Sequence, residues 1–458
     1  MKSTRLYLTV AVLVTGACDF KITDPNNPLP IGNNPSLAQI QAAAAGILVA
    51  ARSDAADWNL DAGIIGREAY RFDGSDPRFI SELLEGPLDP GGGAFGGDHW
   101  SEEYATIRTI NDLLNVIGTA TALSATEQNA TRGFAETFEA YSYLMVLMGH
   151  AEDSIPVDVN RPVTDPPAPF VTNDSAYHFV SNLLDAADAH LAAGGTAFPF
   201  DVGAGFKDAT RGDFSTPALF RRVNRALKAR VEVYRGSLGC GNPCYTAALT
   251  ALGASFIDTA GAATLDDGAY HVYSTRPGDI VNPLFQNPLT GENLVHPSLR
   301  DSVEQKSGGG DDNRYTAKVV SRTLTSAGVP PLSSDLGWLR YPTADAPIPI
   351  IRNEELILLR AEANNALGNP VPAAADINYI RVTSGGLAAI AGLGAQTQTQ
   401  IRDEMLRQKK YSLLYEGHRW NDMRRLGLLN LILIDRPGTD VVHATLPTPL
   451  AEILPRLP

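Results

Sequence analysis

Apolar residues recur at helical spacing along most of the chain, most clearly from Asn353 to Leu367. Four apolar residues of this segment are spaced three to four positions apart and so share one helical face: Leu356, Leu359, Ala363 and Leu367. The break at Gly368-Asn369-Pro370 ends the helix, and a second helix is predicted from about Pro372 to Arg381. The two segments form a predicted helical hairpin.

A similar hairpin is predicted upstream. Ala226 to Arg235 has helical periodicity, Gly241-Asn242-Pro243 interrupts it, and Tyr245 to Leu252 resumes it. Arg132 to Met148 and Ser175 to Leu191 are two further predicted helices. Because one hairpin cannot cover its own apolar face, repeated hairpins stack side by side. The predicted fold class is therefore mainly α, a TPR-like α-α superhelix of helical hairpins.

Long irregular loops rich in Gly and Pro separate these helices: Asp73 to Gly97, Pro156 to Val171, Thr196 to Pro217, and about Thr259 to Ile350. Loops of this length inside a compact domain are usually functional or disordered. We expect a few short β-hairpins among them. We also expect the binding surface to be built from loops on the helical scaffold.

The N-terminus has the pattern of an export signal. Lys2 and Arg5 precede the apolar run Leu6 to Val14, which as a helix would rise only about 14 Å, roughly half of a bilayer core. A permanent membrane span is therefore not predicted. The small pair Gly16-Ala17 before Cys18 favours lipoprotein processing with a lipid anchor on Cys18, and a plain signal peptide cut nearby is the alternative.

Three regions follow from this pattern. Residues 1–17 are assigned as the signal peptide. Residues 18–35 are rich in Asp, Asn and Pro and cannot bury enough apolar surface to fold alone, so they are predicted to be a flexible, lipid-anchored tether. Residues 36–458 are the predicted helical domain.

Composition excludes one class of partner. The chain of 458 residues is 44% hydrophobic, which is enough for a large core, and its formal charge is -14. Lys and Arg form no run that resembles a phosphate-binding patch, so nucleic acid is not an expected partner.

The cysteines fit an exported protein. With Cys18 acylated, Cys240 and Cys244 remain, in a turn-rich stretch. A disulfide between them is favoured in an oxidising compartment, with free thiols as the alternative. A zinc site would need further ligands at a fitting spacing, so no metal is predicted.

The C-terminal region carries the most distinctive sequence, a Glu-Gly-His-Arg-Trp stretch followed by an acidic and a basic residue. It resembles the C-terminal signature of SusD/RagB proteins, although Asn421 stands where an aromatic residue is common. The signature residues are Glu416, Gly417, His418, Arg419, Trp420, Asp422 and Arg425.

Three further stretches resemble the same family in the expected order: Trp100 to Asn111, Arg132 to Pro156, and Glu355 to Arg381. The resemblance implies a TPR-like helical fold with loop excursions, held by lipid at the surface of the outer membrane. It also implies a partner, a SusC-like TonB-dependent transporter, to which glycans or other nutrients are delivered. Neither enzymatic activity nor a cofactor is expected.

Two interpretations of the signature compete. Glu416, His418 and Asp422 are the acid–base groups that an exported hydrolase would use. The alternative, which we favour, is a polar network that locks the last helices onto the scaffold, with Trp420 in the core. No zinc-protease, phosphate-loop, nucleophile-elbow or dinucleotide-binding motif appears in a strand-turn-helix setting.

Sugar binding requires flat aromatic faces beside groups that hydrogen-bond to hydroxyls. Tyr70, Arg71 and Asp73 supply this mixture before a Gly-rich loop, and Trp338 supplies a second aromatic face in the long irregular region. These four residues are the predicted ligand contacts, and the alternative is a helix end with satisfied charges. Trp58 and Trp100 are assigned to the core. The leading hypothesis is a nutrient-binding surface lipoprotein, and its rival is a TPR-like scaffold whose concave face holds a protein partner.

Overall fold

The computed structural model describes residues 31–92, 95, 97–150, 154–162, 164–259 and 264–456. Cys18 and the predicted signal peptide lie outside these residues. Composition assigns residues up to about Pro35 to the tether, but Asn34 is bound to the helical body. Its amide donates to Thr119 Oγ1 (3.0 Å), and its side-chain oxygen accepts from the Thr121 amide (2.8 Å). These bonds attach Asn34 to the helical body.

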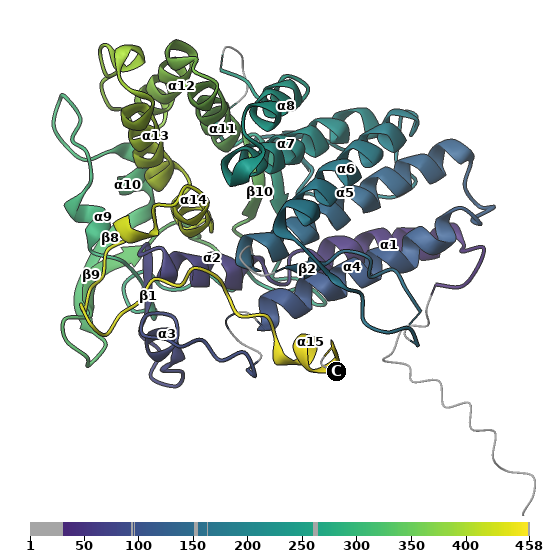
Figure 1. Ribbon diagram of the computed structural model, residues 1–458, viewed down its shortest axis with the longest axis horizontal. Helices are drawn as coiled ribbons and strands as arrows, with labels where there is room; N and C mark the ends of the chain where they lie inside the picture. Colours follow the sequence, from purple (N-terminus) through teal and green to yellow (C-terminus); the bar gives the residue numbers. More distant parts are fainter. Residues whose placement is uncertain are drawn as a thin grey trace, which may run out of the picture.

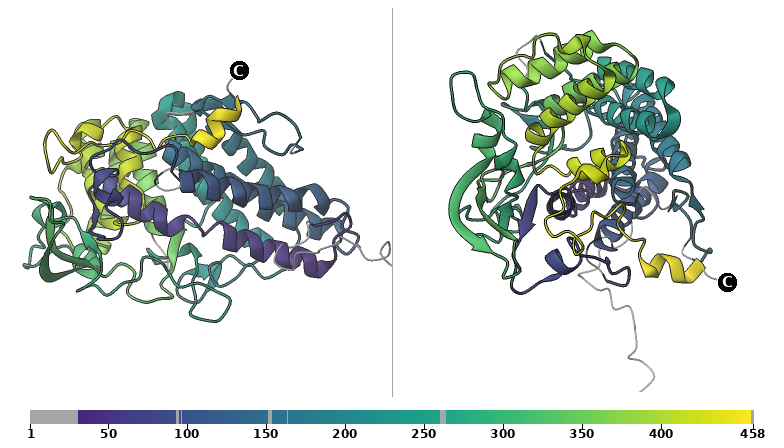
Figure 2. Two further views of the ribbon diagram at one scale, coloured as in Figure 1. Left: turned by 90° about the horizontal axis from the view of Figure 1, so that it is seen from below. Right: turned by 60° about the vertical axis from the view of Figure 1, so that its left-hand side comes forward.

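Successive helices pack side by side and form the scaffold (Figure 1). The first group is α1 (Leu37–Ala50), α2 (Ala55–Ile65), α4 (Gly97–Ile117), α5 (Ala125–His150), α6 (Asn173–Ala192), α7 (Pro217–Arg235) and α8 (Asn242–Gly253). The second group is α11 (Asn353–Ala366), α12 (Pro370–Thr383), α13 (Gln398–Ser412) and α14 (Arg419–Arg425). Short segments are α3 (Arg78–Ser81), α9 (Ser298–Asp301), α10 (Asn313–Lys318), α15 (Leu450–Ile453), η1 (Gly236–Cys240), η2 (Leu393–Ala395), η3 (Leu429–Leu431) and η4 (Leu454–Arg456). Seen from below, α1 and α4 run along the length of the molecule (Figure 2).

The helical hairpin predicted from residue 353 onwards is confirmed as α11 and α12. Gly368 ends it with φ of +77°, a left-handed conformation that favours glycine. An ion pair joins the two helices, because Arg360 Nη2 lies 2.7 Å from Asp376 Oδ1. The other predicted helices lie within α5, α6, α7 and α8, so the mainly α, TPR-like fold class is confirmed.

Strands from distant parts of the chain build the sheets. The main sheet has the antiparallel order β1-β7-β9-β8, formed by Ala69–Arg71, Asn293–Val295, Ser333–Trp338 and Val319–Ser326. Its register pairs Tyr70 with Leu294 and Leu294 with Gly337. Two-stranded sheets pair β10 (Ile348–Arg352) with β6 (Gly268–His271), β2 (Ile155–Pro156) with β3 (Phe170–Val171), and β4 (Lys207–Asp208) with β5 (Gly212–Asp213). The predicted hairpins occur as β4–β5 and β8–β9, whereas β1–β7 and β6–β10 are long-range pairings.

The larger of two apolar clusters runs from Ile40 in α1 to Leu446 near the C-terminus, and a smaller one lies between α11, α12 and α13. Trp58 and Trp100 are each 2% exposed, which confirms their assignment to the core. Within the described ranges, no helix combines the length and the apolar character that crossing a membrane requires.

A disulfide joins Cys240 and Cys244, whose Cα atoms lie 5.9 Å apart. It connects η1, at the end of α7, to the first turn of α8. Gly239 (φ +120°) and Gly241 (φ +66°) form the reversal that brings the two cysteines together.

Residues 428–456, here called the C-terminal segment, return across the N-terminal helices (Figure 1). The Val441 amide donates to the Leu84 carbonyl (2.7 Å), and the Leu446 amide donates to the Gly149 carbonyl (2.9 Å). The Trp420 indole N–H donates to the His443 carbonyl at 2.7 Å. The end of the chain thus completes contacts with both early and late helices.

Candidate functional site

The Glu-Gly-His-Arg-Trp stretch forms the turn between α13 and α14. Gly417 has φ of +74°, and a Cβ atom added there would overlap the indole of Trp58. Glycine is therefore required both by the backbone conformation and by the close approach of α2. Glu416 and His418, on either side, are buried.

Glu416 lies between two arginines. Its Oε1 accepts from Arg340 Nη2 and from Arg352 Nη2, both at 3.0 Å, and its Oε2 accepts from Arg352 Nε at 3.1 Å. Burial alone would raise the pKa of this carboxyl, but the attraction of Arg352 and Arg340 outweighs it and holds the pKa well below its ordinary value. Glu416 is thus a fixed negative charge that binds the turn to β10.

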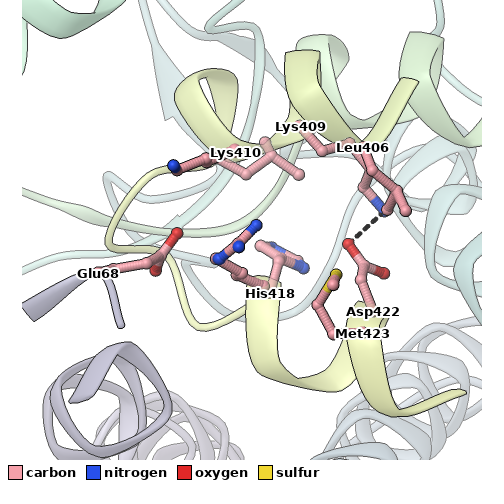
Figure 3. A pocket seen from close by; sticks show the side chains of 9 residues that line it. Glu68, Leu406, Lys409, Lys410, His418, Asp422 and Met423 are labelled. Atoms are coloured by element: carbon pink, nitrogen blue, oxygen red, sulfur yellow. Dashed lines mark ion pairs between the residues drawn. The ribbon is translucent and has the colours of Figure 1, made fainter. Parts of the chain in front are cut away.

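A second ionic group surrounds α14. Lys409 Nζ lies 2.7 Å from Asp422, the pair marked by the dashed line in Figure 3. Arg425 Nη2 lies 2.7 Å from Asp422 Oδ1 and 2.7 Å from Glu362 Oε2. Burial opposes ionisation of Asp422, but Lys409 and Arg425 outweigh it and depress its pKa. The group connects α11, α13 and α14.

His418 has a different partner. Its Nε2 lies 3.8 Å from Glu355, which is itself bound by Arg230 Nη2 at 2.7 Å. Burial lowers the pKa of His418, so its imidazole is neutral at physiological pH. An acid–base pair must face one reacting position. Glu416, His418 and Asp422 instead bind three separate partner groups, and with Trp420 fully buried the arrangement fits a network that locks the last helices in place.

Tyr70 and Trp338 are buried, at 3% and 5% exposed. Tyr70 packs on Phe72 and His296, with centroid separations of 5.1 and 4.6 Å. Trp338 stacks on Tyr415 with 4.2 Å between ring centroids and 7° between planes. The main sheet packs both rings into the core, so they do not form an exposed stacking platform in this structure.

Arg71 and Asp73 stay close to the surface but bind each other, with 2.8 Å between Arg71 Nη2 and Asp73 Oδ2. Asp73 also accepts from the Ser75 hydroxyl (2.6 Å) and amide (2.8 Å). These bonds lower the pKa of Asp73, and the bond from the Ser75 hydroxyl has the largest effect. The Arg71 guanidinium lies over the Phe79 ring, 4.5 Å from its centroid. Ligand contact through Arg71 and Asp73 stays a prediction.

Exposed apolar side chains on the loops were not predicted from the sequence. Phe285 is 42% exposed and is the one exposed aromatic residue in the described part of the chain. Its loop borders β1, because the Phe72 amide donates to the Glu292 carbonyl at 3.0 Å. The available signal was apolar residues without periodicity in a Pro-rich region. The exposed set is Ile280, Val281, Phe285 and Leu289, with Leu324 and Val329 in the β8–β9 hairpin.

A cleft of about 450 Å³ lies between α13, α14 and α9, and we call it the α13–α14 cleft. It continues into a narrower recess that reaches Glu68, next to β1 (Figure 3). Lys410 and Arg419 line both parts, together with Leu406 and Met423. Across the described ranges, no group of three or more His, Cys, Asp or Glu residues is placed to hold a metal ion.

Comparisons with known proteins agree with this architecture. Residues 332–438 match the SusD family. The SusD-like protein P38 of Formosa agariphila is 33% identical over 88 residues, which cover 18% of this chain and 17% of that protein. The match therefore spans less than a fifth of that relative's length.

Solved structures share the fold over nearly the whole chain. NanU of Bacteroides fragilis is 15% identical with a TM-score of 0.68, covering 90% of this chain and 94% of that one. A SusD-like carbohydrate-binding protein of B. fragilis has the same TM-score and 15% identity, with 92% and 98% covered. Surface glycan-binding protein A of Bacteroides fluxus is 16% identical with a TM-score of 0.65, covering 92% and 96%. The fold of this chain is thus that of the SusD-like structures, and its residues 332–438 match the SusD family.

Proposed function

We propose that this protein is an outer-membrane surface lipoprotein that binds glycans or other nutrients and delivers them to a partner TonB-dependent transporter. The observation that carries the proposal is the fold, which matches a SusD-like carbohydrate-binding protein over 92% of the chain. A rigid helical scaffold with long loops suits this role, because the loops can form a recognition surface and no catalysed reaction is required. Binding of this kind raises the local concentration of the nutrient above the transporter.

Binding is tested in affinity gels and on a glycan array with a soluble form of the protein that starts after Cys18. We expect retardation or signal with at least one class of polysaccharide. Arg71→Ala and Asp73→Ala test the loop next to β1, and Arg276→Ala, on an exposed part of another loop, is the matched control. A complete absence of carbohydrate binding on both platforms would contradict the glycan part of the proposal.

The anchor and the partner need separate experiments. Growth with an alkyne-labelled fatty acid is expected to label the wild-type protein, whereas Cys18→Ala is expected to be unlabelled and released from the membrane fraction. Purification of the cross-linked membrane complex is expected to yield a TonB-dependent transporter. Recovery of the wild-type protein without lipid would contradict the anchoring.

A protein-interaction scaffold is the second candidate function. It is favoured by the exposed apolar side chains of the loop around Phe285, which are suited to protein contact. Phe285→Ser would then remove a protein partner from the cross-linked complex while leaving glycan binding unchanged.

A further inference from the structure

The α13–α14 cleft contains two cations that lack a carboxylate partner. Lys410 comes from α13 and Arg419 begins α14, so the two side chains meet where these helices converge. Lys410 Nζ donates to the Ser302 hydroxyl at 2.6 Å, a neutral partner. Arg419 Nε donates to the Gly66 carbonyl at 3.1 Å. Within the described part of the chain, no ion pair engages either side chain, and no hydrogen bond engages the terminal amino groups of Arg419.

Two other cations that line the cleft and its recess, Lys409 and Arg407, are paired. Lys409 binds Asp422 at 2.7 Å, and Arg407, on the rim of the cleft, lies 3.7 Å from Glu404. Figure 3 shows the two arrangements, with the Lys409–Asp422 pair on one side of the recess and Lys410 with Glu68 on the other. A carboxylate bound within the cleft would give Lys410 and Arg419 an ion-pair partner, as Lys409 and Arg407 already have.

Glu68 does not fill this role. It makes no ion pair among the described residues, and its Oε2 accepts from the Tyr415 amide at 3.3 Å. Burial raises the pKa of Glu68 to about 7. Burial, and then the nearby Arg419, lower the pKa of Lys410 to about 7. Partly desolvated charges without an ion-pair partner cost free energy. Because Lys410 and Arg419 lie side by side in an open cleft, a bound anion would stabilise both.

The shape of the cleft limits the choice of ligand. Its volume of about 450 Å³ is within the range of small-molecule pockets. Leu406, Met423 and Leu428 provide apolar walls, and Ser302 and Asp403 add polar groups to the lining. A sugar ring has an apolar C–H face and a hydroxylated rim, which matches this lining. A guanidinium forks onto a planar carboxylate with two parallel hydrogen bonds.

We propose that Lys410 and Arg419 bind the carboxylate of an acidic sugar residue, so that the α13–α14 cleft selects glycans that carry uronic acids. This inference rests on the proposed function, because it names the class of glycan that the protein takes. A phosphate group would satisfy the same two cations, and the experiment below separates the two sources of negative charge.

The test is isothermal titration calorimetry of the mature protein with tetragalacturonate and with the same tetrasaccharide after reduction of its carboxylates to alcohols. The acidic form is expected to bind more tightly. Arg419→Gln is expected to weaken its binding by about tenfold to hundredfold, the usual effect of losing a hydrogen-bonded charge. Lys410→Gln, on the more accessible helix, is expected to act in the same direction and guards against misfolding of the first variant. Arg276→Gln, on an exposed loop that does not line the cleft, is the matched control and should leave binding unchanged.

The possible outcomes distinguish failure of this inference from failure of the proposed function. Equal affinity for both tetrasaccharides, or unchanged binding of the acidic one by Arg419→Gln and Lys410→Gln, overturns the inference while the proposed function stands. Displacement of tetragalacturonate by an equal concentration of inorganic phosphate overturns the sugar specificity. Failure to bind any glycan overturns both.

Discussion

At the scale of single residues, buried ion pairs hold the α13–α14 turn in place. Glu416 is bound by Arg340 and Arg352, and the three groups are enclosed together. Removing one member of such a group is costly, because its partners stay buried with uncompensated charge. The Glu-Gly-His-Arg-Trp signature is therefore explained by packing and charge.

Glu416→Gln tests this explanation. The change keeps the shape of the side chain but removes its charge, so we expect the free energy of unfolding to fall by about 3–5 kcal/mol in urea titrations. Glu102→Gln, on an exposed face of α4, is the control and should have almost no effect. A loss below that of a surface substitution would show that the ion pairs do not stabilise the turn.

Gly417→Ala separates the two reasons for glycine at this position. Gly427 also has positive φ, +70°, but a Cβ atom there would meet no other atom within 4 Å. Gly427→Ala should therefore cost only the backbone term of about 1–2 kcal/mol. Gly417→Ala should cost about 2 kcal/mol more, because it also displaces Trp58. Equal losses in urea titrations would exclude the steric contribution.

Glu68 predicts a pH dependence of stability. Its pKa is about 7 in the folded protein and 4.5 in an unfolded chain, so the folded state binds the extra proton between these values. The resulting stability is fully present below pH 4.5 and is lost as the pH rises to 7. Wild type should lose roughly 3 kcal/mol relative to Glu68→Gln across this window. Parallel profiles of the two proteins, measured by urea unfolding at a series of pH values, would contradict the shift.

At the scale of elements, the helices were predictable and most strand pairings were not. Helical periodicity is local, so it located α6, α8 and the α11–α12 hairpin to within a few residues of their ends, but it placed the start of α5 seven residues and the start of α7 nine residues too late. The pairing of β1 with β7 joins segments more than two hundred residues apart, and three-residue strands are too short for alternation to indicate a buried face. The burial of Tyr70 could not be foreseen for that reason. The α13–α14 cleft was also missed, because its walls come from separate elements.

The disulfide between Cys240 and Cys244 belongs to the same scale, since it connects η1 to α8. A loop this short loses little chain entropy, so replacing both cysteines by serine should lower the free energy of unfolding by about 2 kcal/mol. Adding a reductant to the wild type should have the same effect, and adding it to the double variant should change nothing. A reductant-sensitive double variant would show that another thiol is responsible.

At the scale of the whole molecule, the C-terminal segment holds early and late helices together. Leu446 is 1% exposed and bonds to Gly149 of α5, so Leu446→Ala should destabilise the protein by about 2–5 kcal/mol. Leu454→Ala, at a position 60% exposed, is the matched control. The two variants are compared by thermal and urea unfolding. Similar stabilities would mean that the segment only lies on the surface.

The return of the C-terminal segment also sets an order of events during biosynthesis. Leu84 and Gly149 are translated early, but the residues that bond to them, Val441 and Leu446, are among the last to be made. A nascent or truncated chain that stops short of residue 441 lacks both bonds, and its Trp420 indole lacks its acceptor. Completion of the polypeptide is thereby a condition for the finished fold, and incomplete copies are left open to quality-control proteases.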